Sequence, residues 1–87
     1  MENFQVMMDE TKALVQEYLT NKNKRPSYML EKQLVFILIE LDKMEQTRNC
    51  HMFYPYYPKG ISDSWDYSNP LGAKLLELLA LYCKLYH

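Results

Sequence analysis

The connection between Arg48 and Gly72 constrains the fold most, because it separates two helical segments and has no helical or alternating period of its own. It holds six of the twelve aromatic residues, three of the four prolines and both glycines. Connections this long are uncommon in compact domains and are usually functional or disordered. Disordered segments lack the apolar surface that offsets ordering entropy, so the aromatic content favours order. We therefore expect an ordered loop over residues 48–68.

Two amphipathic helices are expected before this loop, near residues 2–20 and 27–47. In the first, apolar residues recur every three or four positions, with charged residues on the opposite face. The second has Ser27 as a candidate N-cap and a broad apolar stripe along its length. Opposite that stripe lies a narrower one, made of Tyr28, Val35 and Ile39. A helix that is apolar on two sides is expected to be the central one, covered from both directions.

A third helix is expected near residues 69–86, with Ser68 or Asn69 as N-cap and Pro70 at its first position. This segment is apolar around most of its circumference, and two partner helices do not easily cover so much apolar surface. The missing cover is either the aromatic loop folded back or a second copy of the chain, and the sequence leaves both open.

The expected fold is therefore a single all-α domain over residues 1–87. It is a small three-helix bundle with a long ordered aromatic-rich loop between the second and third helices. A short helical turn around Ile61 to Asp66 fits within that loop.

Charge and composition exclude several classes of protein. Ten basic and eleven acidic residues give a net charge of −1, too balanced for a protein that binds nucleic acid through its overall field. The apolar runs are too short to span a bilayer, and residues 1–3 open an acidic segment rather than a basic targeting signal. With two cysteines in no scaffold-like spacing, we expect reduced thiols and a cytoplasmic location.

Metal binding and catalysis have little support in the sequence. Cys83 and His87 are four apart on a helix and can share a zinc ion, for which Cys50 and His51 would be the remaining ligands. However, adjacent residues point in different directions, His87 is the last residue, and no Cys-x-x-Cys is present. No nucleophile elbow, His-Glu-x-x-His motif or Gly-rich phosphate loop occurs either. We expect no cofactor, no metal and no enzymatic activity.

The one local basic cluster consists of Lys22, Lys24 and Arg25, with Lys32 at the start of the next element. Such a cluster beside tyrosines can bind single-stranded nucleic acid through phosphates and stacked bases. This cluster is short, and helix connections are often rich in lysine, so a nucleic-acid-binding module is the second hypothesis.

The first hypothesis is a small regulatory or interaction protein that binds a protein partner through the aromatic loop, because tyrosine and tryptophan dominate interface anchors. We expect Phe53, Trp65 and Tyr67 to point inward and the remaining rings to lie on the surface. Self-association through the last helix, as a dimer, is a further expectation. The candidate partner-binding residues are Tyr54, Tyr56, Tyr57, Trp65 and Tyr67.

Overall fold

The computed structural model describes residues 3–87 and contains no strand among them. The helices within these residues are α1 (Phe4–Thr20), the 3₁₀ segment η1 (Lys22–Lys24), α2 (Glu31–Thr47), α3 (Tyr57–Ser64) and α4 (Pro70–Leu85). The all-α class is confirmed. The described residues form four α-helices where three were predicted, because part of the expected loop is itself helical.

The first and last long helices begin where local capping favours a helix. The Asn3 side chain accepts hydrogen bonds from the backbone N–H groups of Gln5 and Val6, while the predicted start of this helix at residue 2 lies outside the described residues. Asn69 caps α4 by accepting from the N–H groups of Leu71 and Gly72, and Pro70 occupies the first helical position as predicted.

Helix α2 begins four residues later than predicted, and Ser27 does not cap it. The chain first makes a turn in which the Met29 N–H donates to the carbonyl of Pro26 at 3.0 Å. This turn buries the Met29 side chain in the core. The helix then starts at Glu31 after Leu30, which has no capping side chain. Burial of one methionine therefore overrides the local capping signal at Ser27.

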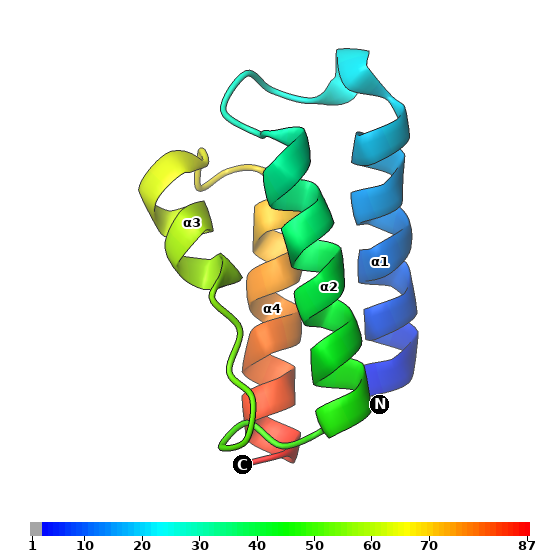
Figure 1. Ribbon diagram of the computed structural model, residues 1–87, viewed down its shortest axis with the longest axis vertical. Coiled ribbons are helices and arrows are strands. Elements are labelled where there is room, and N and C mark those ends of the chain that lie inside the picture. Colours follow the sequence, from blue (N-terminus) through cyan, green and yellow to red (C-terminus); the bar gives the residue numbers. More distant parts are fainter. Residues whose placement is uncertain (1–2) are drawn as a thin grey trace.

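Helix α1, not α2, is the helix that packs against both other long helices. It contacts both α2 and α4, which lie on the same side of it, while α3 lies against α2 and α4 at the other edge of the bundle (Figure 1). The second apolar stripe is covered only in part: Tyr28 packs against the core, whereas Val35 and Ile39 are about half exposed. The prediction of a central α2 is therefore wrong.

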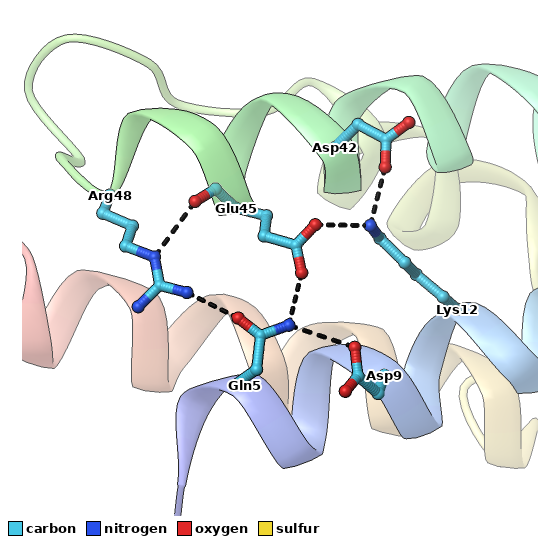
Figure 2. A network of polar contacts seen from close by, with 6 residues as sticks. All are labelled: Gln5, Asp9, Lys12, Asp42, Glu45 and Arg48. Carbon is cyan, nitrogen blue, oxygen red and sulfur yellow. Dashed lines mark hydrogen bonds and ion pairs between the residues drawn. The ribbon is translucent and has the colours of Figure 1, made fainter.

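A polar network fixes one edge of the contact between α1 and α2 (Figure 2). Lys12 on α1 bonds to the carboxylates of Asp42 and Glu45 at 2.6 and 2.7 Å, and the Gln5 amide donates to the other oxygen of Glu45. Arg48 closes the network by donating to the Gln5 side-chain oxygen. These pairs, of which only the Asp42 carboxylate is well exposed, fix the register of two amphipathic helices.

The C-terminal end of α2 depends on Arg48, whose backbone is in the left-handed region (φ 47°). Its guanidinium lies over the rings of Phe4 on α1 and Tyr86 beyond α4, at 5.4 and 5.9 Å. It also donates to the Tyr86 hydroxyl at 3.2 Å. One side chain thereby links the ends of three helices at the point where the crossover, residues 48–69, begins.

The crossover folds back over α4, which is one of the two covers that the sequence left open. The hydroxyl of Tyr82 lies 3.0 and 2.8 Å from the carbonyls of Asn49 and Phe53, and the Cys50 N–H donates to the carbonyl of Tyr86. No helix in the described part of the chain is long and apolar enough to cross a bilayer.

Candidate functional site

Glu40 on α2 holds the start of α3. Its two carboxylate oxygens accept the backbone N–H groups of Tyr56 and Tyr57, at 2.6 and 2.8 Å. These are N–H groups that the first turn of a helix cannot satisfy within itself. Tyr56 provides no side-chain cap, so a residue from another helix supplies it. The carboxylate also lies at the end of α3 where the helix dipole favours negative charge.

Burial raises the pKa of Glu40 above its ordinary value, and this effect outweighs the opposing one of the hydrogen bonds from Tyr56 and Tyr57. The residue is only 2% exposed. Lys43, one turn further along α2, favours the charged form to a smaller degree. Glu40 thus positions the start of α3 within the crossover.

Two of the predicted partner-binding rings belong to the core. Tyr57 is 3% exposed, and its hydroxyl donates to the carbonyl of Leu75 on α4 at 2.9 Å. Its predicted surface position is wrong. Trp65 is 6% exposed, as expected for an inward ring, and its indole N–H donates to the Gln33 side chain at 2.7 Å. Both rings hold the crossover against its neighbours and are not available to a partner.

Gly72 provides the space that lets Trp65 approach α4. A Cβ atom at this position would lie 3.3 Å from Cε3 of Trp65 and 3.5 Å from Cγ2 of Ile61. The second of the two glycines in the sequence therefore matters for close packing between α3 and α4.

The other three rings of the candidate set lie on the surface. Tyr56 is 76% exposed, and Tyr54 is exposed beside it as predicted. Tyr67 is 96% exposed, so the expectation that it points inward is wrong. Phe53 is partly buried and packs against the core, with the Lys43 ammonium 5.8 Å from its ring centre. The alternation of Tyr56 outward and Tyr57 inward follows from the position of Glu40, which fixes the first turn of α3.

Sequence reasoning missed the largest exposed apolar group on a long helix. The outer face of α2 consists of Val35, Phe36 and Ile39, each 45 to 48% exposed. Ile39 follows Val35 by four residues and Phe36 by three, so all three side chains lie on one side of the helix. Lys32 and Lys43 flank this face at its two ends, and neither forms an ion pair within residues 3–87. The signal was available, since Phe36 falls between the two apolar stripes assigned to this segment.

The start of α3 lies against α2 at Glu40, the residue that directly follows Ile39 of the outer face. The Tyr56 backbone is hydrogen-bonded to Glu40, which is one turn after Phe36 on the same helix. Tyr54 is two residues earlier in the crossover. The sequence also offered a signal for the role of Glu40. A carboxylate between Ile39 and the core residue Leu41 lies in an apolar stretch, where it needs hydrogen-bond donors.

One lysine of the basic cluster is paired with a carboxylate. Lys24 donates to the carboxylate of Glu17 at 2.8 Å and lies 5.1 Å from the ring centre of Tyr18, so its charge is partly balanced. Lys22 and Lys24 are in η1, and Arg25 directly follows it. Lys32 lies at the N-terminal end of the outer face of α2 and contributes to that face.

The cysteine and histidine candidates are separated by the fold into one thiol pair and two exposed histidines. In residues 3–87, no group of three or more His, Cys, Asp or Glu side chains is placed to hold a metal ion. His51 and His87 are both exposed. Cys50 and Cys83 are free, partly buried thiols, and burial together with the neighbouring Cys50 raises the pKa of Cys83 to about 11.

The surface formed by the described residues includes two depressions. An open groove of about 340 Å³ lies between α1 and α4, and a smaller hollow of about 100 Å³ lies between the end of α3 and α4. The first is lined by Met7, Glu77, Ala80, Leu81 and Lys84. Comparison with protein-family models, with curated proteins and with solved structures found no match.

Proposed function

We propose that this chain is a small non-enzymatic interaction protein that binds a protein partner through the outer face of α2 together with Tyr54 and Tyr56. The observation that carries the proposal is the half-exposed state of Val35, Phe36 and Ile39 on a helix whose opposite side is fully buried. Contiguous exposed apolar residues with a polar rim are typical of interaction sites. Exposed tyrosines beside them suit an interface, because their rings bury large areas at small conformational cost.

Charge indicates the chemistry of the partner. Lys32 and Lys43 flank the face, so we infer an amphipathic helix whose apolar stripe is flanked by carboxylates. A second copy of the chain fits less well, since antiparallel pairing that places Phe36 opposite Ile39 also places Lys32 opposite Lys43. Like charges at that separation oppose association.

Substitution of the face tests the proposal. In the variant Val35→Ser, Phe36→Ser, Ile39→Ser, helix α2 loses surface apolar groups but none of its core residues, so the fold should persist. The matched control is Val6→Ser with Leu85→Ser, which removes apolar groups of similar exposure from α1 and α4. Partners captured with the wild-type chain from its native host are purified and titrated against all three proteins.

The expected result is at least a tenfold loss of affinity in the triple variant and none in the control, because interface anchors dominate binding energy. Affinity should also fall as salt is raised, since Lys32 and Lys43 are exposed. Equal affinity of the triple variant and the wild type would overturn the proposal. Light scattering separates the alternatives: a wild-type dimer that the triple variant abolishes assigns the face to self-association, and a mass increase with added oligonucleotide favours the second hypothesis.

A further inference from the structure

The fold brings the start of the crossover, which contains Cys50, next to the end of α4, which contains Cys83. Cys50 lies in the first turn of the crossover, and Cys83 lies in the last turn of α4. Two hydrogen bonds bracket them. The residue before Cys50, Asn49, accepts from the hydroxyl of Tyr82, which is the residue before Cys83. The Cys50 N–H donates to the carbonyl of Tyr86, which directly follows α4 and is three residues after Cys83.

We propose that Cys50 and Cys83 are a redox modification site, at which a reversible intramolecular disulfide fastens the crossover to α4. The oxidant class that the site takes is a low-molecular-weight disulfide, such as oxidised glutathione. This inference does not depend on the proposed binding function, because it concerns the opposite end of the crossover from α3 and is read out without a partner.

The reaction proceeds by two thiol–disulfide exchanges. In the first, the thiolate of Cys50 attacks one sulfur of oxidised glutathione, the glutathione disulfide bond breaks, and one glutathione leaves as its thiolate. In the second, the thiolate of Cys83 attacks the Cys50 sulfur of the mixed disulfide and releases the second glutathione. The two protein thiols lose two protons and two electrons in total, and one oxidised glutathione becomes two reduced molecules.

We expect Cys50 to react first and Cys83 second. The raised pKa of Cys83 leaves little of it as thiolate at neutral pH, so it is poorly suited to attack first. Both thiols are partly buried, so exposure does not separate them. Because the closing step needs the Cys83 thiolate, its rate should rise about tenfold per pH unit between pH 7 and 9.

The test uses the full chain at low concentration, treated with oxidised glutathione at pH 8 and analysed by mass spectrometry and thiol titration. The expected product is a monomer lighter by two hydrogen atoms, with no free thiol and no bound glutathione. Reduction with dithiothreitol should restore both thiols. Its melting temperature should exceed that of the reduced chain by at least about 5 °C, since the bond closes a loop of roughly 30 residues. Chains that instead accumulate two glutathione adducts would overturn the proposal.

Three variants separate this geometry from mere flexibility. Cys83→Ser should stop at a single glutathione adduct on Cys50, and Cys50→Ser should form its single adduct more slowly, because the raised pKa of Cys83 leaves less thiolate. The register control, Cys50→Ala with Met52→Cys, moves the thiol to an exposed position two residues away. It should carry adducts without closing. Closure at the wild-type rate in this control would show that any cysteine in the crossover reaches Cys83, and the proposed site would be rejected.

Discussion

The carboxylate of Glu40 accepts the backbone N–H of Tyr57 across 17 positions of sequence, at 2.8 Å. This bond, with its neighbour from Tyr56, lets an eight-residue helix begin in a segment that has no local cap. The position of α3 then decides which aromatic rings are buried and which remain for a partner. The part of the crossover that we propose as contact surface is therefore positioned from α2.

Replacement of Glu40 should measure how much this capping contributes. Glu40→Ala leaves two backbone N–H groups without an acceptor and should lower the free energy of unfolding by about 2 to 3 kcal/mol. Glu40→Gln keeps one acceptor oxygen and should lose about half as much. Urea denaturation gives both values, and amide exchange at Tyr56 and Tyr57 should accelerate in the alanine variant. An alanine variant as stable as the wild type would contradict the capping role.

The same residue predicts a pH dependence of stability. The folded-state pKa of Glu40 is raised above its ordinary value of 4.5, so the folded chain holds this proton more tightly than the unfolded chain does. The bound proton on Glu40 therefore stabilises the folded chain below pH 4.5, and this stabilisation is lost as the pH rises through the raised folded-state pKa. Glu40→Gln does not titrate there. The free energy of unfolding of the variant, relative to the wild type, should therefore increase between pH 4 and pH 7 in denaturation series, and a constant difference would contradict the shift.

The long helices and the N-terminal cap of α4 could be predicted from sequence because the information is local. Asn69 followed by Pro70 is a start signal that needs no tertiary partner. The apolar period of α1 likewise reports the face that it buries. The aromatic composition correctly indicated an ordered crossover, since its rings have enough apolar surface to pack.

The features that sequence reasoning missed depend on residues distant in the chain. Helix α3 needs Glu40, and Tyr57 is buried because that cap directs its side chain toward Leu75. The start of α2 was misplaced because Met29 is buried by tertiary packing, not by a helical period. The apolar stripe at Val35 and Ile39 predicts burial within the domain only if such residues always pack against their own chain. An apolar surface can also serve contacts with other molecules.

Gly72 offers a test of packing between α3 and α4. Gly72→Ala gains helix propensity of about 1 kcal/mol, and contact with Trp65 offsets this gain, so stability should change by less than about 1 kcal/mol. Gly72→Val adds two further carbons against the ring and should cost about 2 kcal/mol or more. Because Trp65 is the single tryptophan, its fluorescence reports the displacement directly. Emission should shift to longer wavelength in the valine variant alone, and an unshifted spectrum with unchanged stability would show that the ring is not confined there.

Tyr56 and Tyr57 are adjacent residues for which the fold predicts opposite results. Tyr57→Ser removes a buried ring and its hydrogen bond to the carbonyl of Leu75, so the free energy of unfolding should fall by about 3 to 5 kcal/mol. Tyr56→Ser removes an exposed ring and should change stability by less than about 0.5 kcal/mol. Both values come from urea denaturation, and Tyr57→Phe, which keeps the ring, should lose only about 1 kcal/mol. A stable Tyr57→Ser protein would show that Tyr57 is not a core residue, and an unstable Tyr56→Ser protein would show that Tyr56 is not merely a surface residue. If both behave as expected, any loss of partner binding in Tyr56→Ser belongs to the interface itself, since the fold that presents it is intact.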